Sequence, residues 1–318
     1  MRDAQVAELA GRQFNRVSRQ QLFGLGFSEA AIQRRITVGR LVIVEQGVFA
    51  VAPVLEHDDW GHRMGATLTA PGSVLSHLSA AAAWGLLSSP RRLVTVTRPG
   101  SGGPRLHGGI VAHRSSTLEG ECTVLQGVPI TSVARTLLDL ARSVSDRALA
   151  RAVREAVRLG LITLPSLGDT LGAYRRRRGA RRLAATVARY SGLPVERARS
   201  GAEIRALEVL CAAGRPLPRL NVRVAGEEAD LSWPVPRLIV EVDGGPFHLD
   251  VGEDQRKQRT WEEAGWTVRR ISSANVYERP SMLLRLAQAS NVLKPPSTSW
   301  NPPLQRSARD VRRGGSAN

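Results

Sequence analysis

Two acidic residues end an apolar stretch in the last third of the chain, and they restrict what this stretch can form. Residues 238–248 read LIVEVDGGPFH, which begins like a buried strand and then carries Glu241 and Asp243 two positions apart. Side chains alternate between the faces of a strand, so both acids lie on one face. Because like charges placed close together destabilise a sheet, this strand needs positive charge beside it.

The preceding residues predict a second strand that adds a third acid to this face. If PVPR is a hairpin loop, Trp233 pairs with Leu238, and antiparallel pairing sets Asp230 opposite Glu241. Asp243 shares that face, so three carboxylates converge. The prediction depends on the loop, because a register slip of one residue would move Asp230 to the other face.

Carboxylates crowded into an apolar sheet do not all ionise unless a cation or several arginines lie close by. Mg²⁺ (or Mn²⁺) suits such a site, because it prefers oxygen ligands and keeps part of its water shell. A water bound in this way can be activated against a phosphodiester. We therefore expect Asp230, Glu241 and Asp243 to form the site of a metal-dependent phosphodiesterase.

The acids lie within a predicted domain, residues 200–293, in which helices flank a sheet. It starts with SGAEIRALEVLCAAG, where apolar residues recur at helical spacing. Three strands follow, then a helix (GEDQRKQRTWEEAG), a strand (WTVRRIS) and a last helix (PSMLLRLAQAS). The expected order is therefore helix, three strands, helix, strand and helix.

This pattern resembles the restriction-endonuclease-like PD-(D/E)xK superfamily, and within it the branch related to very-short-patch-repair endonucleases. The resemblance covers about residues 200–290 and rests on an aspartate on one strand, EVDG on the next, a following histidine, D-x-R on a helix and GW-x-V-x-R on a strand. It implies a mixed sheet and Mg²⁺-dependent endonuclease activity. It also implies that Asp230, Glu241 and the carbonyl of Val242 bind the metal.

The chain departs from the superfamily at Asp243, which stands where a lysine is usual; the short-patch-repair branch also lacks that lysine. Lys257, the only lysine of the domain, is a candidate for a relocated lysine, and Arg256 and Arg259 are alternatives. His248 resembles the histidine that follows DG in the short-patch-repair enzymes, which implies a general acid or a group that orients a water. The other interpretation makes Lys257 an exposed helix residue and His248 a loop residue.

Two further acids have both a functional and a structural interpretation. Glu203 matches the acid on the first helix of the superfamily, yet Ser200 and Glu203 also form a capping box. Asp254 is either an ordinary first-turn acid, which the helix dipole favours, or the partner of an arginine in the site.

The charge of the chain favours a polyanionic partner. Its 318 residues include 45 basic and 28 acidic ones, a net charge of +17. The excess lies in residues 146–200, where thirteen arginines face four acids. A dense run there either contacts phosphates or forms an exposed helix face or linker. The run consists of Arg175, Arg176, Arg177, Arg178, Arg181 and Arg182.

The first 53 residues predict three short helices and a hairpin, which together make a winged helix-turn-helix. Ser18 and Gln21 form a capping box, Ser28 can cap the third helix, and two alternating apolar strands flank a turn at Gln46-Gly47. A DNA-binding role and a protein-interaction role both suit such a domain. In the first role the expected DNA contacts are Gln33, Arg34, Arg35 and Arg40.

The order of these elements, closed by GRLVIVEQGVFAV, resembles the N-terminal domain of abortive-infection type IV antitoxins. The segments VLSHLSAAAAWGLL, RRLVTVTRP and GVPITSVARTLLDLA follow the layout of longer proteins of that kind. The resemblance implies a DNA-binding regulator with a toxin partner or a homodimeric state. In the middle region His62, His77, His107 and His113 show no ligand spacing, and Asp139 fits an amphipathic helix, so we expect no catalytic role there.

The chain is thus predicted to be an α/β (α+β) multidomain protein. Its parts are a winged helix-turn-helix (1–53), an α+β middle region (54–172), an arginine-rich helix or linker (173–199), the endonuclease-like domain (200–293) and a disordered tail (294–318). Cys122 and Cys211 suggest neither a disulfide framework nor a cysteine zinc site. No apolar run approaches the about 20 residues of a membrane span, so we expect a cytoplasmic protein.

Two functions remain open from the sequence. The first is a metal-dependent endonuclease, delivered to DNA by the winged helix and the arginine run, in DNA repair, defence or a toxin–antitoxin system. The second is a DNA-binding regulator of the antitoxin type whose nuclease-like domain has lost catalysis. The retained acids favour the first function, and the missing lysine favours the second.

Overall fold

The chain folds into two compact units, Met1–Glu208 and Val209–Asn318. The computed structural model describes residues 2–53, 58–89, 93–103, 105–244 and 251–288. Both units mix helices and strands, which confirms the predicted combination of α and β structure. His248 and the tail predicted for residues 294–318 lie outside the described residues. Among the described helices, none has the length and apolar character needed to cross a membrane.

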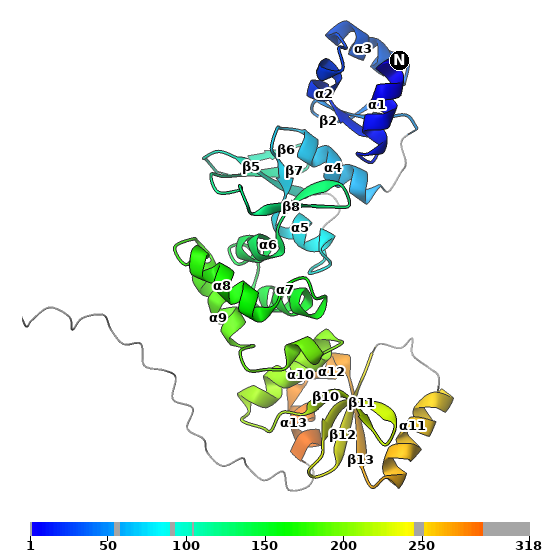
Figure 1. Cartoon of the computed structure of the whole chain (residues 1–318), viewed down its shortest axis with the longest axis vertical. Coiled ribbons are helices and arrows are strands. Elements are labelled where there is room, and N and C mark those ends of the chain that lie inside the picture. Colours follow the sequence, from blue (N-terminus) through cyan, green and yellow to red (C-terminus); the bar gives the residue numbers. More distant parts are fainter. Residues whose placement is uncertain (1, 54–57, 90–92, 104, 245–250, 289–318) are drawn as a thin grey trace, which may run out of the picture. The chain divides into compact units, whose positions relative to one another are not determined.

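The N-terminal part consists of three helices and a three-stranded sheet of order β1-β3-β2 (Figure 1). The elements are α1 (Arg2–Gly11), β1 (Arg16–Ser18), α2 (Arg19–Gly24), α3 (Glu29–Thr37), β2 (Leu41–Glu45) and β3 (Val48–Val51). Ser18 and Gln21 form the predicted capping box, and the Ser28 side chain accepts a hydrogen bond from the Ala31 N–H. Strand β1 was not predicted, because three residues between two helices are too few to show alternation.

The middle part of the same unit is built around a six-stranded sheet of order β6-β7-β5-β4-β9-β8. Its elements are α4 (Asp59–Leu68), β4 (Val74–Leu75), α5 (His77–Ala83), β5 (Val94–Pro99), β6 (Arg105–His107), β7 (Ile110–Ser115), β8 (Cys122–Leu125), β9 (Val128–Thr131) and α6 (Val133–Leu140). Met64, Leu75, Val96 and Ile130 are nearly inaccessible and form its core. The parallel pairs β5–β7 and β4–β9 alternate with antiparallel ones.

A helical layer completes the first unit. It contains α7 (Asp146–Arg158), α8 (Leu164–Tyr174), α9 (Ala180–Ala188) and the short 3-10 helix η1 (Val195–Arg197). Leu149, Val153 and Ala156 repeat at helical spacing on α7, and all three are buried. The segment predicted as an arginine-rich helix or linker therefore belongs to a folded layer, which buries Leu183 and Tyr190.

The C-terminal unit carries a four-stranded mixed sheet of order β10-β11-β12-β13. Its elements follow α10 (Gly201–Ala212) and are β10 (Arg219–Val224), β11 (Glu227–Trp233), β12 (Leu238–Asp243), α11 (Val251–Glu263), β13 (Thr267–Ser272), α12 (Ser273–Glu278) and α13 (Pro280–Gln288). β12 and β13 are parallel, and the other pairs are antiparallel. Figure 1 shows α11 on one side of this sheet and α12 and α13 on the other.

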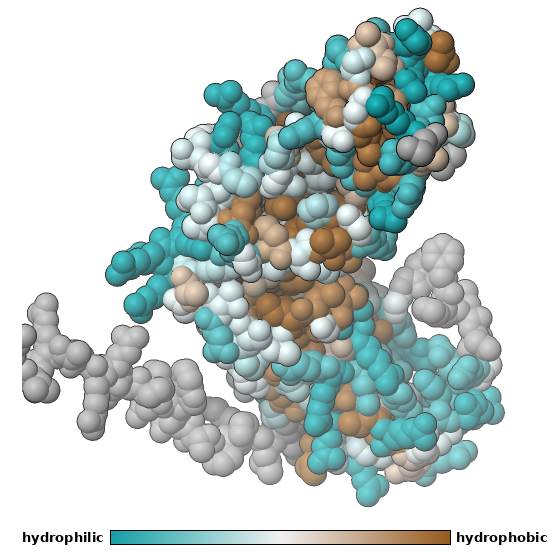
Figure 2. All heavy atoms as spheres, turned by 45° about the horizontal axis from the view of Figure 1, so that its top comes forward, coloured by the Kyte–Doolittle hydropathy of each residue, from teal (hydrophilic) through white to brown (hydrophobic). Residues whose placement is uncertain are grey.

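The division between the units falls inside α10, nine residues later than the predicted domain start at residue 200. The part of this helix up to Glu208 belongs to the first unit, where Glu208 Oε1 accepts a hydrogen bond from Arg154 Nη1 at 3.3 Å. A boundary inside a helix leaves no Pro or Gly signal in the sequence. Much of the visible surface of the C-terminal unit is hydrophilic (Figure 2).

Trp261 anchors α11 to the sheet, and its loss tests this packing. The indole is fully buried with Val224, Ala229 and Ile239, and its Nε1–H donates to the Val224 carbonyl at 3.0 Å. We expect Trp261→Ala to lower the free energy of unfolding of the C-terminal unit by about 3–5 kcal/mol, because it leaves a cavity and an unpaired carbonyl. Urea denaturation followed by amide exchange in the sheet measures the loss.

The matched control is Val235→Ala, because Val235 is 79% exposed. Its unfolding midpoint should equal that of the wild type. An unchanged midpoint in Trp261→Ala would contradict the packing of α11 on the sheet.

Candidate functional site

The predicted register of the two acidic strands is confirmed. Trp233 pairs with Leu238 and Leu231 pairs with Val240, so the next opposed positions are Asp230 and Glu241. Beyond the Leu231–Val240 pair, hydrogen bonds from backbone N–H groups to these two side chains connect the strands. The Asp230 N–H donates to Glu241 Oε1 at 3.0 Å, and the Val242 N–H donates to Asp230 Oδ2 at 2.8 Å. Each carboxylate thus accepts a hydrogen bond from the opposite strand, which fixes the two acids side by side.

This crowding changes the acidity of Glu241. Its half-buried carboxyl has a pKa raised from 4.5 to about 7, first because burial disfavours the charged form and then because Asp230 is negative. The hydrogen bond from the Asp230 backbone and the charges of Lys257 and Arg270 act in the opposite direction. A cation bound between the two acids would favour the charged form of Glu241 and so oppose this rise in its pKa.

The third predicted acid, Asp243, lies in an ion pair. Arg270 on β13 is the Cα partner of Glu241 on the parallel strand β12. Arg270 Nη1 lies 3.2 Å from Asp243 Oδ1 and 3.0 Å from Asp254 Oδ2. Asp254 is therefore the partner of an arginine in the site, which is one of its two predicted interpretations.

Arg270 is the site residue that the sequence interpretation missed. The residue belongs to the GW-x-V-x-R element, but its position beside Glu241 depends on the parallel pairing of β12 with β13, which are separated by α11. Its positive charge compensates Asp243 and Asp254. An arginine thus supplies positive charge beside the acids at the end of β12.

The basic residues of α11 differ in their roles. Lys257 is half-buried, and its charge lowers the pKa of Glu241, so it acts on the site through space. Arg256 Nη1 is held by Glu227 Oε1 at 2.5 Å, whereas Arg259 is exposed. Of the predicted alternatives on this helix, Lys257 is thus the residue whose charge stabilises the ionised form of Glu241.

A complete metal cage of side chains is not seen in the described part of the chain. No group of three or more His, Cys, Asp or Glu residues stands close enough there to hold a metal ion. Asp230 and Glu241 are joined directly, and Asp243 instead binds Arg270. The oxygen donors that the described contacts bring together at the predicted position are the carboxylates of Asp230 and Glu241, with the Val242 N–H bound to the first of them.

Glu203 has the structural role that its capping box predicts. It is 4% exposed, its Oε2 accepts from the Arg199 N–H at 2.9 Å, and its own N–H donates to Ser200 Oγ at 3.1 Å. These two bonds hold the start of α10.

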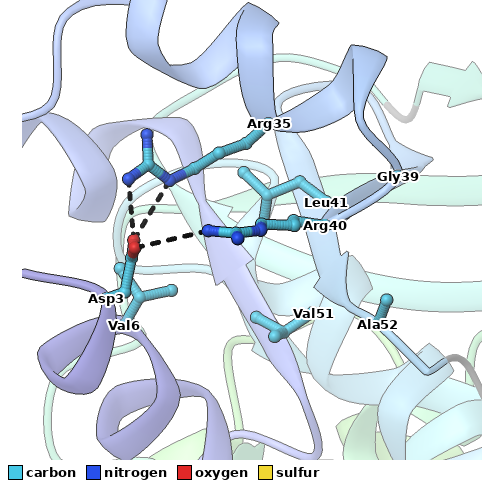
Figure 3. Close-up of a pocket in the computed structure, with 8 residues that line it drawn as sticks. All are labelled: Asp3, Val6, Arg35, Gly39, Arg40, Leu41, Val51 and Ala52. Carbon is cyan, nitrogen blue, oxygen red and sulfur yellow. Dashed lines mark hydrogen bonds and ion pairs between the residues drawn. The ribbon is translucent and has the colours of Figure 1, made fainter.

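The predicted DNA contacts of the winged helix fall into two groups. Gln33 and Arg34 on α3 are exposed. Arg35 and Arg40 converge on Asp3 of α1, with Nη2 of Arg35 at 2.7 Å and Nη1 of Arg40 at 3.7 Å from its carboxylate oxygens (Figure 3). This acid lowers the number of free positive charges on the predicted recognition surface.

The arginine run is divided in the same way. Arg177 Nη1 lies 2.5 Å from Glu121 Oε1, and Arg182 Nε lies 2.6 Å from Asp146 Oδ1, so these two stabilise the helical layer. The exposed members are Arg175, Arg176, Arg178 and Arg181. The run is thus partly structural and partly available to a partner.

The middle region contains a polar centre that the sequence did not reveal. Arg135 on α6 is 6% exposed and binds Glu121 at 2.6 Å and Asp139 at 3.1 Å. The rings of His77 and His113 stack beside it, with centroids 3.9 Å apart. Their separation in the chain hides this proximity; the sequence signal is two charged residues, four positions apart, on the mostly apolar helix α6.

We compared the chain with known families, curated proteins and solved structures. No family model matches the chain, and no curated protein matches it. Among solved structures, the chain is similar to the RV2827C protein from Mycobacterium tuberculosis, with 17% sequence identity and a TM-score of 0.40 over 68% of this chain and 82% of that one. A likeness at this level carries no argument about function.

The raised pKa of Glu241 makes the stability of the C-terminal unit depend on pH. The folded chain keeps this proton up to about pH 7, whereas the unfolded chain releases it near pH 4.5. Stability from this group is therefore complete below pH 4.5 and is lost as the pH rises to about 7. We expect Glu241→Gln to have a higher urea midpoint than the wild type above pH 7, in EDTA, and a similar one below pH 4.5.

Glutamine keeps an oxygen that accepts from the Asp230 amide, so the comparison isolates the charge. Glu263→Gln, an exposed change on α11, is the control and should follow the wild type at each pH. Parallel curves for Glu241→Gln and wild type would contradict the raised pKa.

Proposed function

We propose that this chain is a DNA-binding protein whose C-terminal unit is a metal-dependent phosphodiesterase, an endonuclease of the PD-(D/E)xK type. The direct pairing of Asp230 with Glu241 carries the proposal. The sheet order β10-β11-β12-β13, with a parallel last pair separated by α11, supports it, because it is compatible with the helix and strand order expected for that superfamily.

The donor set fits Mg²⁺ or Mn²⁺. Asp230, Glu241 and the carbonyl of Val242 would hold the ion, and burial of two adjacent carboxylates makes positive charge favourable between them. When bound, such an ion polarises a phosphate oxygen and lowers the pKa of a bound water. The chain itself contributes positive charge through Arg270 and Lys257, which favours the approach of a phosphodiester to this end of the sheet.

Arg270 replaces the missing lysine in this proposal. Asp243 and Asp254 both contact Nη1 of its guanidinium, so its position is fixed before the substrate arrives. Delivery to DNA falls to the exposed Arg34 on α3 and the exposed members of the arginine run. The biological setting in this proposal is DNA repair, defence or a toxin–antitoxin system.

The same ion pairs favour a second candidate function. Asp243 and Asp254 neutralise the arginine near the acids, which lowers the charge available to stabilise a transition state. A DNA-binding regulator of the antitoxin type, with an inactive nuclease-like unit and a toxin partner or a second copy of itself, is compatible with that arrangement.

Cleavage of nucleic acid tests the first candidate. Plasmid and single-stranded substrates, DNA and RNA, are incubated with the full chain in Mg²⁺ or Mn²⁺, with and without EDTA. We expect Asp230→Asn and Glu241→Gln each to lower the cleavage rate by about 100-fold or more, since each removes a charged metal ligand worth several kcal/mol. Glu263→Gln is the control with the same chemical change and should keep full activity.

The outcomes separate the two functions. Cleavage that needs a divalent ion and both acids supports the endonuclease. Absence of cleavage on all substrates, together with retained DNA binding, supports the regulator. Cleavage that survives both substitutions contradicts the assignment of Asp230 and Glu241.

DNA binding by the winged helix has its own test. We expect Arg34→Ala to weaken binding to the DNA upstream of the protein's own gene and to reduce the slope of log affinity against log salt by about 1, because it removes one phosphate contact. Arg12→Ala, just after α1, is the charge-matched control, since this exposed arginine already pairs with Glu8. Gel shifts over a salt series measure both values, and an Arg34→Ala slope equal to that of the control would exclude α3 as the recognition helix.

A further inference from the structure

A pocket in the first unit is lined by side chains from distant segments of the chain, and none of the acids of the candidate metal site belongs to it. It has a volume of about 230 Å³. Arg114 comes from β7, Arg142 follows α6, and Arg178 precedes α9, while Gly102 and Gly103 line the pocket from the loop after β5. Such a concave site with converging polar groups is the usual form of a ligand site.

Two histidines line one side of the pocket. The rings of His77 and His113 are stacked with an interplanar angle of 17°, and His77 Nδ1 lies 3.0 Å from Ser76 Oγ. The pKa of His77 is lowered to about 3, first by burial and then by the charges of His113 and nearby arginines; burial also lowers that of His113. Both rings are therefore neutral at physiological pH, and each offers one N–H donor and one acceptor.

The pocket has an excess of positive charge. In the described part of the chain, Arg114, Arg142 and Arg178 have no acidic partner within ion-pair distance. The one acid that lines the pocket, Asp139, is held by Arg135 with Nε to Oδ1 at 3.1 Å. Three arginines that lie outside ion-pair distance of an acid, in one pocket, point to an anionic ligand, and arginine suits phosphate in particular.

Asp139 gives an independent indication of a polar ligand. The residue is 2% exposed, and its Oδ2 has no hydrogen-bond partner within the described residues. Oδ2 lies 4.0 Å from His77 Nδ1, too far for a hydrogen bond. Buried polar atoms are normally satisfied, so this oxygen is an unsatisfied acceptor in the wall of the pocket.

The glycine loop keeps Arg114 in place beside the pocket. Gly100 and Gly102 both have φ near +122°, a conformation that other residues rarely adopt. A Cβ on Gly102 would stand 3.3 Å from Cδ of Arg114, and one on Gly100 would stand 3.2 Å from its Nη1. The missing side chains thus allow the loop to lie directly against the guanidinium.

We propose that this pocket binds the phosphate group of a nucleotide. Arg114, Arg142 and Arg178 contact the phosphate, and the rings of His77 and His113 lie beside it. The pocket volume suits a phosphate with its sugar, while the base remains outside. The phosphate belongs either to a free nucleotide or to the terminus of a nucleic-acid strand, and both present the same group.

Binding of defined probes to the full chain tests the proposal. The probes are AMP and a short DNA oligonucleotide with either a 5′-phosphate or a 5′-hydroxyl. Histidine-selective NMR follows the ring signals, and His113→Asn identifies one of them. Arg142→Gln and Arg178→Gln are suitable variants, because both arginines are exposed and the fold does not depend on them; Arg151→Gln, an exposed arginine of α7, is the control.

We expect AMP, or the 5′-phosphorylated strand in preference to its 5′-hydroxyl form, to shift the signals of His77 and His113. Each arginine variant should bind the active probe about tenfold more weakly, the loss of one charge-assisted contact, and the control should match the wild type. Binding of AMP assigns the pocket to free nucleotides, and binding of the phosphorylated strand alone assigns it to strand termini. Failure of all probes to shift these signals, or equal affinity in the variants and the control, overturns the proposal.

Discussion

The exchange of hydrogen bonds between Asp230 and Glu241 determines the end of the C-terminal sheet. Two acids facing each other across antiparallel strands would repel if each only projected from the sheet. Each instead accepts a backbone N–H across the β11–β12 pair, so the carboxylates replace ladder bonds and remain adjacent. The cost appears in the raised pKa of Glu241. Nearby, Arg270 forms ion pairs with Asp243 and Asp254, so that its positive charge compensates these two acids.

Arginine has a similar organising role in the first unit. Arg135 forms ion pairs with Glu121 and Asp139. Arg154 donates a hydrogen bond to the Tyr190 hydroxyl and forms an ion pair with Glu208. Buried ion pairs are weak evidence of stability, since desolvation offsets much of the attraction. They do specify which segments meet, because a buried guanidinium left without its acid is costly. The large arginine content thus serves internal packing as well as any partner.

Local features of the fold could be predicted from the sequence. The helix caps at Ser18 and Ser28 follow from side chains next to the helices that they start, and the register of β11 and β12 follows from a four-residue turn between them. Non-local features could not be predicted. Arg270 reaches its position only through a parallel crossover, and His77 meets His113 only because β5 pairs with β7 in the middle sheet. For the candidate site, the sequence therefore identified the three acids and missed Arg270, which pairs with Asp243.

The position of the unit boundary inside α10 has a practical consequence for dividing this chain. A fragment that starts at Val209 would begin in mid-helix, without the Ser200–Glu203 cap that starts α10. A first fragment that stops at Glu208 would have this residue, which pairs with Arg154, as its last one, at the end of a truncated helix. Protease-resistant pieces should therefore keep α10 whole, whichever unit they contain.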